Sequence, residues 1–378
     1  MIRVLHVIGA MGTGGAENMI MNIFRTIDRK KIQFDFVVHS EKRQFYDAEI
    51  EELGGKIYHV NKFVIGNGVY YLRWWNNFFK LHNEYIIVHG HINSSAFLYL
   101  SVAKKYNRIT IIHSHATNDP AVSVRNYIFK FFSFFTRYTA DYFFACSLSA
   151  GMDRFGEKVI SSNRFEVIEN GIDADKFRFN KEKREKIREE LGISDNTIVV
   201  GHVGRFTRAK NHDFLIRFYK SYRELVFKSE LWLVGDGELK KDIQKLAEAN
   251  DLGDSVRFIN VTKQVENYMQ AMDVFVFPSI FEGLGIVLIE AQASGLPCIV
   301  SENIQKEADI GAGIVFQLDL RENMDKWIET VNRALEMKRK DNIKNIIESG
   351  FSIYDSAKKL ESLYFSMLEY YNRKRKFK

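Results

Sequence analysis

The chain alternates short apolar runs with longer stretches of helical spacing. The apolar runs occupy residues 4–8, 34–38, 86–88, 109–112 and 142–145, and then 198–203, 231–234, 256–259, 274–277 and 298–300. Runs that are apolar on both faces and separated by helices are typical of strands in buried parallel sheets. The pattern therefore predicts an α/β protein with two successive series of strands.

A charged segment, residues 173–195, separates the two series and is rich in Lys, Arg and Glu. We expect a surface helix there, between two doubly wound domains. A length of 378 residues also suits two domains of ordinary size. We place the first domain at residues 1–172, the second at 173–352 and a final element at 353–378.

The final element has the spacing of an amphipathic helix over residues 354–371. Apolar side chains recur there at intervals of three and four; they are Leu360, Leu363, Tyr364, Met367, Leu368 and Tyr371. Five of the last six residues are Arg or Lys, which predicts a short basic tail.

The composition is globular, with 46% hydrophobic and 27% charged residues. A net charge of +6 favours acidic partners, which include nucleic acid, an anionic lipid surface and an anionic substrate. Cys146 and Cys298 lie far apart in apolar runs, and this favours reduced thiols in the cytoplasm. No apolar run reaches the roughly 18 residues that a bilayer-spanning helix needs. We expect a cytoplasmic protein that could still dock peripherally on a membrane.

The most informative segment is residues 278–297. Here Glu282 and Glu290 bracket the turn Gly283-Leu284-Gly285, which opens a short apolar helix. The start of a helix leaves backbone N–H groups unpaired and suits a phosphate, while glycine lets a ligand approach the main chain. The two carboxylates can accept hydrogen bonds from hydroxylated rings on either side of a diphosphate. A nucleotide-sugar has that shape.

This Glu-x7-Glu segment resembles the signature of the family-4 retaining glycosyltransferases, which have the GT-B fold. The resemblance implies two facing Rossmann-like domains, an active site in the cleft and a final helix that crosses back to the first domain. It also implies that Glu282 contacts the transferred sugar and Glu290 the nucleotide ribose. The alternative is a buried helix capped by a glycine turn, with an incidental acid at each end.

A glycine-rich segment, residues 12–17, follows the first predicted strand. It lacks the third glycine of a dinucleotide fingerprint, because Glu17 stands in its place. The segment resembles instead the family loop that closes over the donor diphosphate, which implies this role for Gly14 and Gly15. A tight strand-to-helix turn without a ligand is the alternative.

Two cations, Arg205 and Lys210, follow the first strand of the second series. They resemble the family's Gly-Arg…Lys-Asn segment, whose cations hold the diphosphate. Charge builds on the leaving diphosphate as the glycosidic bond breaks, so fixed cations stabilise the transition state more than the ground state. The alternative is a solvated basic loop.

A second glycine turn, residues 234–237, resembles the family's Val-Gly-Asp-Gly turn and implies that Gly235 borders the nucleoside. Asn260 stands where the family usually has glycine, which leaves recognition of the base open.

Histidines recur in pairs at the ends of two predicted strands. His115 resembles the family histidine that contacts the transferred sugar, although His113 lies two residues earlier and could exchange roles with it. His89, His91 and Asn93 fit either the acceptor side or a structural role. Because carboxylates and cysteines are missing nearby, we expect no metal site.

Residues 125–137 interleave aromatic and basic side chains. A buried helix with extended cations and a helix at a membrane surface both fit, and we favour the buried helix. No RNA-binding module accompanies the segment, so we expect no nucleic-acid partner. At the domain junction, residues 170–173 resemble the family's Asn-Gly-Ile-Asp hinge, and Asp173 and Asp175 suit helix capping.

Together these resemblances imply a retaining glycosyltransferase that needs no cofactor or metal. It would move a hexose from a nucleotide-diphosphate sugar, with UDP favoured over GDP, to a polyprenyl-diphosphate-linked saccharide of a bacterial capsule, exopolysaccharide or O-antigen. The alternatives are a GT-B nucleotide-sugar epimerase and a non-catalytic nucleotide-sugar-binding subunit. The catalytic set is His115, Arg205, Lys210 and Glu282. The donor set is Gly14, Gly15, Arg205, Lys210, Gly235, Glu282, Gly283, Leu284, Gly285 and Glu290; the acceptor-side set is His91, Asn93 and His113.

Overall fold

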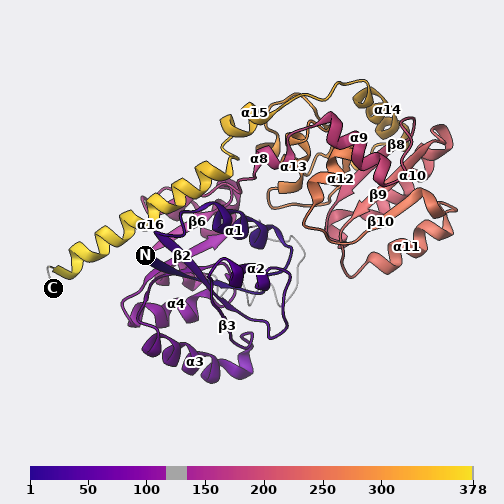
Figure 1. The fold of residues 1–378 in the computed structure, drawn as a ribbon. Helices are drawn as coiled ribbons and strands as arrows, with labels where there is room; N and C mark the ends of the chain where they lie inside the picture. Colours follow the sequence, from indigo (N-terminus) through magenta and orange to yellow (C-terminus); the bar gives the residue numbers. More distant parts are fainter. Residues whose placement is uncertain (116–133, 377–378) are drawn as a thin grey trace. The chain divides into compact units, whose positions relative to one another are not determined.

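The structure, a computed structural model, describes residues 1–115 and 134–376. The chain divides into two compact units (Figure 1). Unit 1 consists of Met1–Gly171 and Ile353–Lys378, and unit 2 consists of Ile172–Ser352. The domain boundary expected after residue 172 lies next to the division between Gly171 and Ile172.

Unit 1 is built on a seven-stranded parallel sheet with the order β3-β2-β1-β4-β5-β6-β7. Its strands are β1 (Ile2–Ile8), β2 (Ile32–Val38), β3 (Ile57–His59), β4 (Tyr85–Gly90), β5 (Ile109–Ser114), β6 (Tyr142–Ala145) and β7 (Phe165–Val167). Its described helices are α1 (Gly15–Thr26), α2 (Asp47–Glu52), α3 (Gly68–Leu81), α4 (Ala96–Lys105), α6 (Leu148–Phe155), α7 (Glu157–Ile160) and α16 (Ile353–Lys376).

The sheet of unit 1 is buried on both faces because its strands are apolar at successive positions. Val4 of β1 joins a core that α1 and α16 cover, whereas the next residue, Leu5, joins a core that α3 and α4 cover. All seven residues of β2 are buried. This arrangement is the doubly wound fold that the continuous apolar runs predict.

The last helix, α16, belongs to unit 1 and lies beside α1 (Figure 1). Its apolar stripe is buried against the first core, as the spacing of three and four predicts; the buried residues are Leu360, Tyr364, Met367 and Leu368. At the start of the helix, a Cβ atom on Gly171 would lie 2.7 Å from the Cα of Ile353. Only glycine lets these two segments pass so closely.

Unit 2 has a six-stranded parallel sheet with the order β10-β9-β8-β11-β12-β13. Its strands are β8 (Ile198–Val203), β9 (Ser229–Val234), β10 (Val256–Ile259), β11 (Val274–Phe277), β12 (Cys298–Ser301) and β13 (Val315–Leu318). Its helices are α8 (Ala174–Phe177), α9 (Lys181–Glu190), α10 (His212–Leu225), α11 (Lys240–Ala249), α12 (Val265–Ala271), α13 (Ile286–Ala293), α14 (Met324–Leu335) and α15 (Ile343–Glu348).

All ten predicted strands are present, and the charged segment forms α8 and α9. Asp173 caps α8, its side chain accepting from the backbone N–H of Lys176, while Asp175 lies in the first turn. The apolar runs do not predict β3, β7 and β13. Each is a short strand at the edge of its sheet, so it has no long apolar run to mark it.

Most of the aromatic and basic stretch, residues 125–133, lies outside the described residues. In the part described, Phe134 and Phe135 are exposed, and the guanidinium of Arg137 lies over the ring of Phe134. The buried-helix interpretation does not hold for these two phenylalanines. Among the helices of residues 1–115 and 134–376, none is long and apolar enough to cross a membrane.

Candidate active site

Two loops of unit 2 form one joined surface at the carboxyl ends of neighbouring strands. Residues 204–211 follow β8 and residues 278–285 follow β11, which pairs with β8 in parallel. The backbone N–H of Ile280 donates to the carbonyl of Ala209 at 2.8 Å. The side-chain amide of Asn211 donates to the carbonyl of Pro278 at 3.1 Å. Ligands of open α/β sheets bind at this edge.

An ion pair crosses between the two loops. Lys210 Nζ lies 2.5 Å from Glu282 Oε1, with the side chains 18% and 11% exposed. The ammonium also lies 4.8 Å from the centroid of the Phe277 ring. Because both charges are largely removed from water, each depends on the other or on a ligand of suitable charge. The two predicted site residues are therefore in direct contact, which their separation in sequence does not reveal.

Helix α13 begins immediately after the second loop. Gly285 precedes its first residue in the left-handed conformation, with φ of 80°, and no side chain caps the helix start. The first backbone N–H groups of α13 are therefore available to an anion. Leu284 is buried in the core, whereas Gly283 is half-buried. Leu284 thus anchors the turn.

Arg205 lies on the first loop with its side chain exposed. Among the residues that the structure describes, no acidic partner is found for it. This guanidinium therefore has the freedom to turn toward a bound anion. Arg208, which the family motif does not include, is also exposed.

The glycines of the 234–237 turn are required by close backbone packing. A Cβ atom on Gly235 would lie 2.1 Å from the carbonyl oxygen of Gly204, and one on Gly237 would lie 2.5 Å from that of Phe206. The turn thus rests directly against the loop that carries Arg205 and Lys210. Asn260 accepts from Lys240 Nζ at 2.7 Å, and the same ammonium reaches the carbonyl of Gly235 at 3.2 Å. The residue that departs from the family pattern therefore braces this turn.

Glu290 lies one turn before the end of α13 and is half-buried. Burial raises its pKa to about 8; Lys176 opposes this rise and Glu266 adds to it. Lys176 is itself paired with Glu266 at 3.2 Å, so it is shared between two acids. At neutral pH, Glu290 of the free protein is mostly protonated.

In unit 1, the glycine-rich segment leads directly into α1. Gly14 precedes the helix, and a Cβ atom there would lie 2.4 Å from a carboxylate oxygen of Glu17. Gly15 is exposed and has open space around it. Only the movable carboxylate of Glu17 lies close to Gly14, so both Gly14 and Gly15 leave main chain open to approach.

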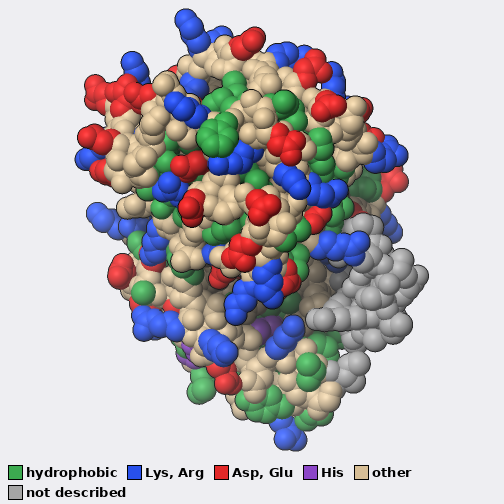
Figure 2. All heavy atoms as spheres, turned by 90° about the vertical axis from the view of Figure 1, so that its right-hand side faces the viewer, with side chains coloured by type: hydrophobic (Ala, Val, Ile, Leu, Met, Phe, Trp, Pro, Cys, Tyr) green, Lys and Arg blue, Asp and Glu red, His purple; other side chains and the backbone are tan. Residues whose placement is uncertain are grey.

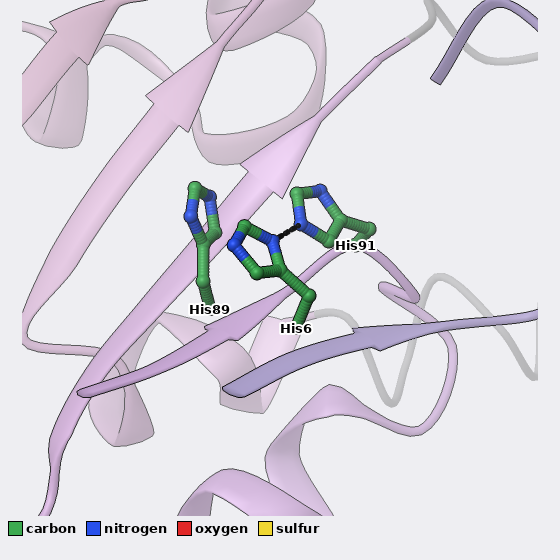
Figure 3. A group of neighbouring side chains, drawn as sticks. All are labelled: His6, His89 and His91. Atoms are coloured by element: carbon green, nitrogen blue, oxygen red, sulfur yellow. Dashed lines mark hydrogen bonds between the residues drawn. The ribbon is translucent and has the colours of Figure 1, made fainter. Parts of the chain in front are cut away.

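Five histidines meet at the carboxyl ends of three neighbouring strands of unit 1. They are His6 of β1, His89 and His91 at the end of β4, and His113 and His115 at the end of β5. His6, His89 and His113 are buried, whereas His91 and His115 are half-buried. Figure 3 shows three of them side by side. Asn93 donates to the carbonyl of His113 at 3.5 Å.

The sequence predicts two histidine pairs, and the structure adds His6 to them. A signal for it exists in the sequence, because His6 is the one polar residue within the apolar run 4–8 of the strand that pairs with β4. Two sets of imidazole nitrogens, those of His6, His89 and His91 and those of His91, His113 and His115, each lie within 4.8 Å of one another. Neither set includes a carboxylate or a cysteine.

Burial lowers the pKa of every histidine in this cluster. The pKa of His6 falls to about 3 and that of His115 to about 4. The pKa values of His89, His91 and His113 are also lowered by burial, and neighbouring imidazoles lower them further. All five rings are therefore neutral at pH 7. Each has one donor and one acceptor nitrogen.

Charges on the surface are mixed. Figure 2 shows Lys and Arg interspersed with Asp and Glu over the face drawn. The net charge of +6 is therefore not gathered into one broad basic patch on that face.

Comparison with known proteins identifies the family. The model described as "Glycosyltransferase Family 4" matches residues 13–176, and the model described as "Glycosyl transferases group 1" matches residues 183–350. The chain is 35% identical to EpsF of Bacillus subtilis (strain 168), which carries the name of a glycosyltransferase. This match spans 88% of the chain and 87% of EpsF.

Two further matches support the family and the fold. An Escherichia coli protein named UDP-Gal:alpha-D-GlcNAc-diphosphoundecaprenol alpha-1,3-galactosyltransferase is 32% identical over 56% of this chain and 57% of its own. Anabaena Alr3699/HepE, solved in complex with UDP and glucose, superposes with a TM-score of 0.79 at 18% identity, covering 97% of this chain and 100% of HepE. The GT-B fold expected from the motifs is confirmed, and the chain belongs to the family-4 glycosyltransferases.

Proposed function

We propose that the protein transfers a hexose, with retention of configuration, from a UDP-sugar to a hydroxyl of a lipid-linked saccharide in the biosynthesis of a bacterial surface polysaccharide. The proposal rests on the contact between two loops of unit 2, residues 204–211 and residues 278–285. It brings Lys210, Glu282 and the uncapped start of α13 together at one sheet edge.

The diphosphate is assigned to Lys210, Arg205 and the first N–H groups of α13. When the glycosidic bond breaks, negative charge grows on the leaving diphosphate, and donors fixed in a partly dry site stabilise that charge strongly. Lys210 is already held in place by Glu282 and the Phe277 ring. Little reorganisation is therefore required when the charge develops. The cations and the helix start take the role that a divalent metal has in other transferases.

The two acids are assigned to the sugars on either side of the diphosphate. Glu282 would accept hydrogen bonds from the transferred hexose, and Glu290 from the ribose of the nucleotide. Glu290 is mostly protonated in the free protein, so ribose hydroxyls can replace the solvation that burial has removed. Gly235 would border the nucleoside, next to the loop that carries Arg205.

Three residues of unit 1 are assigned to the same donor. His115 would contact the transferred sugar, and the open main chain at Gly14 and Gly15 would close on the diphosphate. Front-side attack by the acceptor hydroxyl, with the departing phosphate taking its proton, needs no protein nucleophile. His91, Asn93 and His113 are proposed to support the acceptor side.

The acceptor is proposed to be a saccharide on polyprenyl diphosphate. The E. coli relative is named for a diphosphoundecaprenol-linked acceptor, and the positive net charge of this chain suits such an anionic lipid. An enzyme with this acceptor works at a membrane surface, so we propose peripheral contact with the inner face of the cytoplasmic membrane.

Nucleotide binding provides the first test. UDP should raise the unfolding temperature most and GDP second, because a ligand that binds only the folded state stabilises it. Equal shifts with UDP, GDP and ADP, or no shift with any, would contradict the donor assignment. A Lys210→Ala variant should lose most of the UDP shift, whereas Lys241→Ala, on the exposed face of α11, should keep it.

Product analysis separates transfer from epimerisation. Incubation with donor alone should give only slow hydrolysis, and sugar transfer should appear when a lipid-linked acceptor is added. Conversion of the sugar to its epimer without acceptor would indicate an epimerase. Retention is read from the anomeric configuration of the new linkage by NMR.

A further inference from the structure

Three of the clustered histidines in unit 1 form a continuous chain of nitrogen contacts. His6 Nδ1 lies 2.9 Å from His91 Nε2, and His91 Nδ1 lies 2.7 Å from His115 Nε2. Figure 3 shows His6 and His91 facing each other through these nitrogens, with His89 alongside. Both ring nitrogens of His91 are therefore engaged. The chain runs from the buried strand β1 to the half-buried end of β5.

The rings in this chain meet edge to edge. The His6 and His91 rings are 7° from parallel with centroids 5.2 Å apart, and the centroids of His91 and His115 are 5.0 Å apart. In both pairs the distance between the ring centroids exceeds the distance between the facing nitrogens by about the width of one imidazole ring. Two rings give this relation only when their facing nitrogens lie nearly on the line between the centroids, as in a linear N–H···N hydrogen bond.

A second chain packs beside the first. The hydroxyl oxygen of Tyr364, on α16, lies 2.7 Å from His89 Nδ1, and His89 Nε2 lies 3.3 Å from His113 Nδ1. His89 stacks on His91 at 4.4 Å, and His113 stacks on His115 at 4.1 Å between centroids. The first chain is therefore supported along one face by other rings and cannot turn freely.

This geometry favours hydrogen bonding over metal binding. A zinc ion would lie about 2.0–2.1 Å from each imidazole nitrogen, on the lone-pair axis of each ring. Two nitrogens that face each other at 2.7 or 2.9 Å offer no such point unless the rings rotate. The stacking rings of the second chain oppose that rotation.

The surroundings of the two end residues set the direction of the hydrogen bonds. Three neutral imidazoles in a row always leave one N–H group at one end and one bare nitrogen at the other. The end atoms, His6 Nε2 and His115 Nδ1, are both buried and have no partner among the described residues, but only His115 lies at the end of its strand, where a ligand could displace its neighbours. His6 is 1% exposed between Phe34 and Phe36, whereas His115 is half-buried. A buried N–H group without an acceptor is rarer in proteins than a buried acceptor without a donor. The ring nitrogen that carries no hydrogen is therefore assigned to His6.

We propose that His6 and His91 are positioning residues that set the tautomer of His115, so that its Nδ1–H is held as a hydrogen-bond donor for an oxygen atom of the substrate. His6 Nδ1–H donates to His91 Nε2, and His91 Nδ1–H donates to His115 Nε2. Each bond polarises the next, which strengthens the donor at the end of the chain.

This inference rests on the proposed function, in which His115 contacts the transferred sugar. A sugar hydroxyl that accepts from His115 keeps its own hydrogen for a carboxylate. The histidine is thereby assigned to orient the sugar, and proton removal from the acceptor is left to the leaving phosphate.

The tautomer can be read directly. In the full chain, prepared without an affinity tag and labelled with ¹⁵N-histidine, two-bond ¹H–¹⁵N spectra distinguish Nδ1–H from Nε2–H rings. His6, His91 and His115 should all carry hydrogen on Nδ1. Hydrogen on Nε2 of His115 would overturn the inference. One equivalent of bound transition metal that is lost in His91→Phe would also overturn it.

Variants test whether the tautomer matters. His91→Phe keeps a flat ring but removes both bonds, so the Nδ1–H signature of His115 should be lost and kcat should fall roughly tenfold, as expected for one or two lost hydrogen bonds. His6→Phe removes only the far bond and should lower kcat about two- to threefold. His59→Gln, on the exposed edge strand β3, should change neither.

A further variant separates positioning from general support. Tyr364→Phe breaks the second chain and should lower the unfolding temperature without moving the His115 tautomer. If Tyr364→Phe and His91→Phe lower kcat equally with the tautomer unchanged, the positioning role is wrong. If His115→Ala abolishes transfer while His91→Phe retains both rate and tautomer, only this inference fails. Absence of nucleotide binding would instead contradict the proposed function and leave the tautomer result standing.

Discussion

The two units share one sheet plan but carry opposite chemistry at the same edge. In each, the first strand is central, and the order of the sheet runs outward from it in the same way. At the carboxyl ends of the central strands, unit 1 gathers neutral imidazoles among aromatic rings. Unit 2 gathers a paired lysine and glutamate, an arginine and an uncapped helix.

The difference is consistent with the proposed donor, a nucleotide-sugar. A diphosphate requires fixed positive charge, which unit 2 supplies. A hexose has only hydroxyl groups, and neutral imidazoles recognise these without attracting unrelated anions. One topology therefore supports both tasks, because the loops and strand ends are free to differ while the core stays the same.

One position in the central strand of each sheet shows how closely the two units correspond. His6 is the fifth residue of β1, and His202 is the fifth residue of β8. In unit 2, however, His202 Nδ1 lies 2.9 Å from the carbonyl oxygen of Val276, and its ring meets one further imidazole, that of His212, edge to face at 4.8 Å between centroids. The same strand position thus contacts backbone and a single imidazole in unit 2, but belongs to a chain of hydrogen-bonded imidazoles in unit 1.

The largest expected effect comes from removing the fixed cation of unit 2. Lys210→Ala should lower kcat by about 10²–10³, the range for losing one preorganised charge-stabilising donor. Steady-state transfer assays check this, with Lys241→Ala as a control on the same unit. Lys210→Arg keeps the charge and should recover part of the rate. Wild-type turnover in Lys210→Ala would remove the basis for assigning catalysis to this loop.

Acid should weaken unit 1 more than unit 2. Six histidines of unit 1 have pKa values that burial lowers, against two in unit 2; the six are His6, His39, His89, His91, His113 and His115, and the two are His202 and His212. The unfolded chain binds protons near pH 6.5 and these folded sites do not. Stability is therefore present above pH 6.5 and lost as pH falls toward 4, by up to about 1.4 kcal/mol per pH unit for each histidine.

Amide hydrogen exchange at pH 7 and pH 5, corrected for intrinsic rates, measures this difference. Protection should fall more for β1 and β4 than for β8 and β9. Equal losses in both sheets would contradict the dominance of the imidazole cluster.

Glu290 should show the reverse dependence. Burial raises its pKa to about 8, so the folded protein holds a proton that the unfolded chain releases near pH 4.5. Stability from this group is present at low pH and declines as pH rises toward 8. Glu290→Gln should flatten the decline in the unfolding temperature between pH 5 and pH 8. It should also weaken UDP binding by roughly two- to tenfold, since a hydrogen bond between neutral groups contributes about 0.5–1.5 kcal/mol. An unchanged pH profile would place the titrating group elsewhere.

The smallest effect is expected at the turn before α13. Gly285 has φ of 80°, and a Cβ atom there would lie 3.4 Å from the Phe277 ring, so alanine meets conformational strain rather than a severe clash. Gly285→Ala should cost about 1–2 kcal/mol in unfolding free energy. Gly192→Ala, with φ of 71° and open space, is the matched control. Both should lose similar stability, but only Gly285→Ala should also weaken UDP binding.

Prediction from sequence succeeded where a pattern is local or long. The central strands are continuous apolar runs, and the Glu282–Glu290 spacing marks a helix with an acid at each side of its start. The apolar pattern does not predict the edge strands β3, β7 and β13. Each of them pairs with a neighbour on one side only and is too short to show a periodicity of apolar residues.

Contacts between distant residues could not be predicted in the same way. Nothing local links Lys210 to Glu282, or His6 to His91; strand order and register bring them together. Likewise, Asn260 departs from the family motif, and only the contact with Lys240 explains what it does instead.

The contribution of Tyr364 to the histidine cluster has a consequence for how the molecule is made. Residues 1–171 of unit 1 are synthesised before unit 2, yet the core and the imidazole network of unit 1 are completed by α16, which is synthesised after unit 2. Unit 2 is a single uninterrupted stretch and can finish folding before that helix appears. A nascent chain arrested before residue 353 should therefore resist protease in the later-made half and remain cleavable in the earlier one.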